Sequence, residues 1–295
     1  MKKPLVIILT ALMLLLSGCG SEPVTADIVA TTLPVYDFTA RITAGTDLTV
    51  SVLVTESVSC LHDYSLQVHQ MRLIEGANTV ILSGAGLEDF LSDALQSADR
   101  VIDASKGIDL VCGTHDHEHQ EDNHDHGHSH EQDPHIWLSP VNAKAMAANI
   151  CRELSNVYPQ YKELFNSNLQ YLTEDLQELQ EYGEAALADL KCRELITFHD
   201  GFSYFAEAFG LVILEAVEEE SGSEASAAEL IQLIKMVNEH QLPAVFIEKN
   251  GSSAAASIIA TETGISCYTL DMAMSADSYF SAMYHNINTI REALQ

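Results

Sequence analysis

The sequence predicts an α/β protein with two lobes, each built on a mostly parallel sheet flanked by helices, joined by one long rigid helix. Three observations lead to this prediction. Short apolar segments alternate with helical patterns in both halves of the chain. Between the halves lies a long stretch with few helix breakers, at residues 141–190. Hydrophobic residues make up 47% of the 295 residues, which is ample for a substantial core.

The first half of the chain contains four candidate strands separated by helical patterns. The strands are short and apolar, as expected for a parallel sheet that is covered on both faces. They span Ile28–Thr31, Leu48–Leu53, Thr79–Leu82 and Val101–Asp103. The helical patterns cover Val35–Ala44, Leu66–Gly76 and Leu87–Ala98. We therefore expect a first lobe over residues 27–140, which includes a histidine-rich loop at residues 113–133.

Residues 141–190 form the predicted helical linker. Tyr158-Pro159 interrupts it, because a proline inside a helix removes a backbone hydrogen bond. After this interruption, leucines recur at helical spacing at positions 164, 169, 172, 176 and 179. This periodicity predicts that the second part of the linker is the long amphipathic helix that bridges the lobes.

The second lobe is expected over residues 191–295. Its candidate strands are Glu194–Phe198, Leu211–Leu214, Ala244–Glu248 and Ser266–Leu270. Its candidate helices are Tyr204–Phe209, Ala225–His240, Ser252–Thr263 and Asp277–Leu294. Ligands of such sheets collect at the carboxyl ends of the strands, so we expect the functional site in a crevice between the lobes.

The first residues predict export. Lys2 and Lys3 precede an apolar run at residues 5–16, a pattern typical of a secretory signal and too short to span a bilayer comfortably. The next residues, Leu16-Ser17-Gly18-Cys19, resemble a bacterial lipobox. They imply a signal peptide at residues 1–18, lipidation of Cys19, and a lipidated tether at residues 19–26 that anchors the protein to the extracytoplasmic face of the cell membrane.

Charge and cysteine content narrow the class of protein. The chain has 14 basic and 43 acidic residues and a net charge of −29, which argues against nucleic acid and favours cations near the surface. Without a CxxC pair, a structural zinc knuckle is not expected. Five cysteines besides Cys19 leave at least one thiol unpaired, although disulfides can form outside the cytoplasm. They are Cys60, Cys112, Cys151, Cys192 and Cys267.

The segment from His115 to His135 is rich in histidine and acidic residues and has almost no apolar residues. Such a composition predicts a mobile loop, because it cannot bury enough surface to offset its ordering entropy. Neutral imidazole is the commonest protein ligand of transition metals, so the loop is a candidate auxiliary metal-collecting surface. The alternative is a solvated, charged loop. Its histidines, apart from His135, are His115, His117, His119, His124, His126, His128 and His130.

Three histidines and one aspartate occupy loop or strand-end positions at the expected crevice: His62, His135, His199 and Asp271. Three imidazoles and one carboxylate would complete a tetrahedral zinc site with no open position. The alternatives are structural histidines and, for Asp271, a helix cap. A closed metal site favours binding over catalysis, because a catalytic zinc keeps a position for water or substrate.

No motif of a known enzyme class supports catalysis. The chain lacks HExxH, a GxSxG elbow, a P-loop and a Rossmann glycine fingerprint. We therefore expect a binding protein and not an enzyme. Two alternatives belong to other classes. One is a secreted zinc-dependent hydrolase with Glu248 as its base, and the other is a surface adhesin with incidental metal binding.

Several segments resemble the zinc- and manganese-binding lipoproteins of bacterial ABC metal importers, and among them the zinc-uptake, ZnuA-like group. The resemblance runs from about Asp27 to the C-terminus, with DPHIWLSP and FHDGFSYF as its most specific motifs. The segments are VATTLPVYDF at 29–38, LHDY at 61–64, GAGLE at 84–88, DPHIWLSP at 133–140 and FHDGFSYF at 198–205.

The resemblance implies a function and a set of ligands. His62, His135 and His199 would bind the metal, and Asp271 stands where members often supply a fourth ligand. The transported ion would be Zn²⁺, because manganese is better served by more carboxylate oxygens; a manganese-selective member is the alternative. The implied partners are an ABC permease with its ATPase, and the protein would act as a monomer. One departure is Cys60-Leu61 before His62, where the family usually has Asp-Pro.

Overall fold

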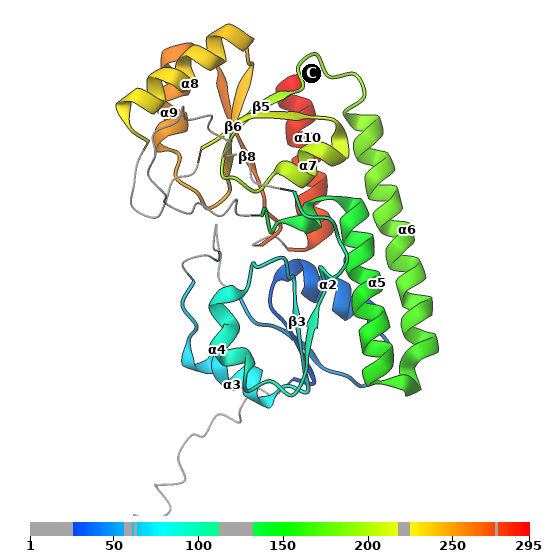
Figure 1. Ribbon diagram of the computed structural model, residues 1–295. Helices are drawn as coiled ribbons and strands as arrows, with labels where there is room; N and C mark the ends of the chain where they lie inside the picture. The colour runs from blue at the N-terminus through cyan, green and yellow to red at the C-terminus, as the bar shows by residue number, and fades with distance from the viewer. Residues whose placement is uncertain (1–25, 56–60, 62–63, 112–131, 218–224, 275–276) are drawn as a thin grey trace, which may run out of the picture.

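The computed structural model describes residues 26–55, 61, 64–111, 132–217, 225–274 and 277–295 (Figure 1). His62 and the seven loop histidines between residues 115 and 130 lie outside the described residues. The same holds for the predicted signal peptide and for Cys19, Cys60 and Cys112. Among the described cysteines, Cys151, Cys192 and Cys267 are free thiols.

The first lobe is a four-stranded parallel sheet with the order β2-β1-β3-β4. Its strands confirm the four predicted positions: β1 (Ile28–Ala30), β2 (Val50–Val52), β3 (Thr79–Leu82) and β4 (Val101–Asp103). The central strand β1 is buried at every residue, which explains its continuous apolar sequence. The helices of this lobe are α2 (Leu33–Ile42), α3 (Val68–Gly76) and the short α4 (Ser92–Leu95).

The predicted helix at Leu87–Ala98 is wrong in extent. Only a 3₁₀ turn (η1, Asp89–Leu91) and α4 form there. The cause is the preceding turn, in which Gly84, Ala85 and Gly86 all have positive φ angles. The turn sends the side chain of Glu88 into the core, where it accepts hydrogen bonds from the backbone N–H groups of Ser83 and Gly84. Burial raises the pKa of Glu88 to about 7.

The second lobe repeats the strand order of the first. Its sheet is also parallel, with the order β6-β5-β7-β8. The strands are β5 (Glu194–Phe198), β6 (Val212–Ala216), β7 (Ala244–Glu248) and β8 (Ser266–Leu270). The helices are α7 (Ser203–Phe209), α8 (Ala227–His240), α9 (Ala254–Thr263) and α10 (Tyr279–Leu294). The chain passes to opposite sides of β5, so the gap between the ends of β5 and β7 is a topological switch point, where ligands of such sheets bind.

Two long helices follow the first lobe in the sequence and pack side by side, and the second of them runs along both lobes (Figure 1). They are α5 (Pro140–Val157) and α6 (Lys162–Ala186), separated by a 3₁₀ turn (η3, Pro159–Tyr161) at the predicted interruption. The 25 residues of α6 span about 37 Å. This helix contacts the first lobe where Arg41 pairs with Asp175, and the second where Tyr182 donates to Asn288. The prediction of a long amphipathic bridging helix is therefore confirmed.

The largest hydrophobic cluster continues across both lobes, and each lobe has a smaller cluster of its own. Trp137, which is fully buried, donates from Nε1 to the carbonyl of Met272 over 2.8 Å, and its own carbonyl accepts a hydrogen bond from the Tyr279 hydroxyl. The ring of Tyr279 packs edge-on against Phe38 of α2, with centroids 4.9 Å apart. The backbone N–H of Tyr279 donates to the carboxylate of Asp37. These contacts tie α2 and α10 together, so the side chains between the lobes are held in fixed relative positions.

In the part of the chain that the structure describes, no helix combines the length and the apolar character needed to cross a bilayer.

Candidate metal site

His135 is buried at the start of the turn that leads into α5. It stands directly before the 3₁₀ turn η2 (Ile136–Leu138) and is 3% exposed. Its Nδ1 lies 2.8 Å from Oδ1 of Asp133, and its backbone N–H donates to the same oxygen over 2.9 Å. A carboxylate acceptor requires the ring proton on Nδ1. We assign that tautomer, which leaves the lone pair of Nε2 for a metal.

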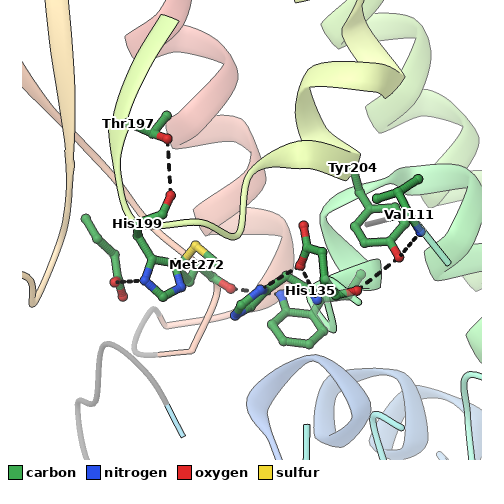
Figure 2. Close-up of polar contacts among 9 residues, drawn as sticks. Val111, His135, Thr197, His199, Tyr204 and Met272 are labelled. Carbon is green, nitrogen blue, oxygen red and sulfur yellow. Dashed lines mark hydrogen bonds and ion pairs between the residues drawn. The ribbon is translucent and has the colours of Figure 1, made fainter. Parts of the chain in front are cut away.

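His199 follows β5 directly, at the switch point of the second sheet. Its ring meets that of His135, with centroids 5.1 Å apart and planes inclined by 79° (Figure 2). Its Nδ1 lies 3.6 Å from Oε2 of Glu248, the last residue of β7. The Thr197 hydroxyl donates to the His199 carbonyl over 3.1 Å. Two imidazoles that are distant in the sequence are thus brought together, each with a carboxylate beside Nδ1.

Gly201 makes this approach of the two rings sterically feasible. A Cβ atom at this position would lie 2.8 Å from both His135 Nδ1 and His199 Cδ2, and 2.6 Å from Met272 Cε. Real Cβ atoms essentially never come so close to other atoms. The residue at this position therefore has to lack a side chain for the two histidines to keep their arrangement.

Two buried carboxylates lie at the carboxyl ends of the neighbouring strands. Glu248 ends β7, and its pKa is raised to about 8 by burial and by the nearby Asp271 carboxylate. Asp271 follows β8, and Asn286 of α10 bonds to both its backbone N–H and its carbonyl. The carboxylate of Asp271 accepts from the Ala273 N–H at Oδ1 and from Lys249 Nζ at Oδ2. His199 thus lies beside His135 on one side and Glu248 on the other, and Asp271 lies near Glu248.

Val111 and Asp133, which lie on either side of residues 112–131, are joined to each other and to the site. The N–H of Asp133 donates to the Val111 carbonyl. The hydroxyl of Tyr204 accepts from the Val111 N–H over 3.1 Å and donates to the Asp133 carbonyl over 3.0 Å (Figure 2). Because Asp133 also orients His135, one short series of hydrogen bonds links Tyr204 of α7 to that imidazole.

The predicted site residues have different outcomes. His135 and His199 lie together, and Asp271 lies at the adjacent strand end but is paired with Lys249. His62 lies outside the described residues. Within the residues that the structure describes, no three His, Cys, Asp or Glu side chains converge closely enough to hold a metal ion. The described residues thus provide two imidazole donors, and further donors would have to join them.

Sequence reasoning overlooked four features of this site: the Asp133 contact, the need for Gly201, the Glu248 contact with His199, and Lys249. Asp133 carries a sequence signal, because it stands two residues before His135. Glu248 was considered only as the base of a hydrolase, whereas the structure places it against a ligand candidate. Lys249 has no local signal, because its partner comes from another strand.

This fold and site define a class: a binding protein with two α/β lobes, bridged by a long helix, in which imidazoles gather between the lobes. The chain belongs to the ZnuA family, described as zinc-uptake complex component A, periplasmic, which it matches over residues 28–293. The resemblance noted in the sequence is thereby confirmed. The family consists of metal-binding proteins and not enzymes, so the prediction of a non-enzyme is also confirmed and the hydrolase alternative is dropped.

Two relatives are similar to this chain in sequence. Zinc-binding lipoprotein AdcA of Streptococcus pneumoniae R6 is 28% identical over 307 residues, which cover 99% of this chain and 61% of AdcA. The chain thus spans about three fifths of that relative. The high-affinity zinc uptake system protein ZnuA of Bacillus subtilis 168 is 29% identical, with 97% of this chain and 96% of that protein covered.

Solved structures agree with the fold. A crystal structure of ZnuA superposes with a TM-score of 0.80 at 30% identity, covering 92% of this chain and 100% of the other. A zinc-bound ZnuA with residues 138–173 deleted superposes with a TM-score of 0.79 at 30% identity, covering 92% and 98%.

Proposed function

We propose that this protein binds Zn²⁺ between its two lobes outside the cytoplasm and delivers it to the permease of an ABC importer that is powered by its ATPase. The observation that carries the proposal is the pair of imidazoles, the buried His135 and the partly exposed His199, which meet at the switch point of the second sheet. Family membership and the zinc-binding names of the relatives support the choice of ion.

The proposed ligands are His62, His135, His199 and Asp271. Three nitrogens and one oxygen satisfy the tetrahedral preference of zinc, and imidazole suits this borderline metal. His135 and His199 each have a carboxyl group beside Nδ1, which leaves Nε2 available to a metal. A manganese-selective protein remains the second candidate, because the Glu248 carboxyl group lies beside His199 and the Asp271 carboxylate lies near Glu248.

The proposed location is the extracytoplasmic face of the membrane, with the protein anchored as a monomer through a lipid on Cys19. Support comes from the lipobox-like sequence before Cys19 and from the lipoprotein name of AdcA. Export would place the zinc site where an importer meets its cargo. Delivery can be measured as zinc uptake by vesicles that contain the permease and its ATPase. Uptake should require this protein, and equal uptake without it would contradict the delivery role.

Zinc binding should weaken as the pH falls. Imidazoles bind metal only when deprotonated, and the ordinary pKa of histidine is about 6.5. Protonation therefore competes with zinc below that value, and we expect the zinc affinity at pH 5 to be at least about tenfold below that at pH 8. The measurement is a competition titration with a chelator, corrected for the protonation of the chelator. A zinc affinity that is constant over this range would contradict histidine ligation.

The histidine-rich segment is proposed to collect zinc at several weaker positions beside the main site. Deletion of residues 115–130 should lower the total zinc bound per protein and leave the tightest affinity nearly unchanged. The deletion keeps Val111, Asp133 and Tyr204, so the hydrogen bonds that hold His135 stay in place. Elemental analysis and a chelator competition measure the two quantities separately. A collapse of the tight affinity would instead show that the segment belongs to the main site.

A further inference from the structure

Lys249 places a positive charge directly beside the candidate ligands. It follows Glu248 at the end of β7, and its backbone N–H donates to the Leu270 carbonyl, which aligns it with the end of β8. Its Nζ lies 2.9 Å from Oδ2 of Asp271. The side chain of Lys249 is 46% exposed, whereas that of Asp271 is 5% exposed. A partly solvated ammonium group thus reaches inward to a buried carboxylate.

The pairing means that a metal ion has to share the Asp271 carboxylate with other donors. Its Oδ1 accepts the Ala273 N–H over 2.8 Å, and its Oδ2 is taken by Lys249. The backbone of Asp271 is also held, because Asn286 accepts from its N–H and donates to its carbonyl. A cation that uses this carboxylate has to compete with the ammonium group for Oδ2. This competition lowers the binding affinity most for the metal ion that depends most on oxygen ligands.

We propose that Lys249 is a specificity-determining residue, which engages the Asp271 carboxylate and thereby favours zinc over manganese at the inter-lobe site. The inference rests on the proposed zinc-binding function and names the source of its selectivity. Zinc is satisfied largely by imidazole nitrogens, whereas manganese is a harder ion that needs carboxylate oxygens. The ammonium charge repels both divalent ions equally. A difference in affinity between the two metals therefore has to arise at the Asp271 oxygen to which Lys249 donates.

The test compares the full mature chain with Lys249→Met, which keeps the length of the side chain and removes its charge. Lys235→Met is the matched control, because Lys235 lies on α8, is 71% exposed and pairs with Glu239. Zinc chloride and manganese chloride affinities are measured by chelator competition, and bound manganese is also measured by electron paramagnetic resonance. We expect Lys249→Met to raise the manganese affinity about tenfold or more and the zinc affinity by less than about threefold. Lys235→Met should change neither.

A second pair of variants shows whether the effect passes through Asp271. In an Asp271→Asn background, Lys249→Met should no longer improve manganese binding selectively. Lys249→Arg should keep the selectivity of the wild type, because it keeps the charge. Thermal unfolding tests whether each variant is folded. If Lys249→Met is not folded, Lys249→Gln is used in its place.

Two results would overturn the proposal. One is an equal change for both metals, or no change, in Lys249→Met. The other is a selective manganese gain that persists when Asp271 is replaced. Neither result touches the proposed function, which depends on tight zinc binding by the wild-type protein. Weak zinc binding by the wild type would instead refute the proposed function itself, whatever the Lys249 variants show.

Discussion

Replacing His199 by alanine should lower the zinc affinity of the protein about 100- to 1,000-fold. A four-ligand zinc site provides about 10–16 kcal/mol of binding free energy, so one ligand accounts for roughly 2.5–4 kcal/mol. His199 is a suitable residue to substitute because its ring contacts that of His135 while its side chain is 14% exposed. The substitution therefore opens little space in the core, and the free energy of unfolding should change far less than the affinity for zinc.

A matched histidine variant separates ligation from a general loss of imidazole. His240 of α8 also stands beside a carboxylate, with Nδ1 3.0 Å from Glu194, but it lies on the surface and 39% of its side chain is exposed. His240→Ala should bind zinc at the main site as the wild type does. The measurement is a chelator competition with elemental analysis of the purified proteins. Equal affinities for His199→Ala and the wild type would remove the observation on which the proposed function depends.

Gly201→Ala should lower the zinc affinity about 10- to 100-fold without removing any ligand. The added methyl group would lie 2.8 Å from His135 Nδ1 and from His199 Cδ2, so at least one imidazole has to move. The Met272 methyl group can shift, because it ends a flexible side chain. His135 has less freedom, because Asp133 fixes its ring. Disturbing the orientation of a metal-binding histidine typically costs a loss of this size.

Two further glycines provide the controls for this variant. Gly251→Ala adds a methyl group whose nearest neighbour is the Glu248 carbonyl at 3.4 Å, so zinc affinity should be preserved. Gly183→Ala would bring a methyl group 2.2 Å from Phe209 in the core, so stability should fall while the affinity of the folded protein is kept. Chelator competition and thermal unfolding of all three variants give the comparison. A Gly201→Ala protein that binds zinc like the wild type would mean that the ring arrangement is not required.

The elements of the fold were largely predictable because they are encoded locally. Strands such as β3 and β7 are runs of apolar residues bounded by polar ones. This pattern can be recognised without knowing which strand lies beside them. The break before α6 follows from Pro159 alone. The predicted helix at Leu87–Ala98 was wrong in extent because the structure there depends on the core. After the Gly84–Gly86 turn, the side chain of Glu88 is buried in that core, and no local pattern indicates this.

At the candidate site, the sequence predicted possible metal donors, of which the structure brings His135 and His199 together. His199 and Asp271 follow recognisable strands, and parallel strands place their carboxyl ends at one edge of a sheet. His135 was found by its DPHIWLSP context. The partners of these residues were not foreseen, because Glu248 and Lys249 are 49 and 22 positions away from His199 and Asp271.

The sequence by itself determined the two α/β halves, the bridging helix and the imidazoles that face the space between the lobes. Each of these features follows from the spacing of hydrophobic residues, from helix-breaking residues and from residue type over a few consecutive positions. Only the tertiary structure decided that Asp133 and Glu248 support the histidines, that Gly201 lets the rings approach, and that Lys249 engages Asp271. The physical reason is that these contacts depend on strand register and on the packing of the lobes, which bring together side chains that no local pattern connects.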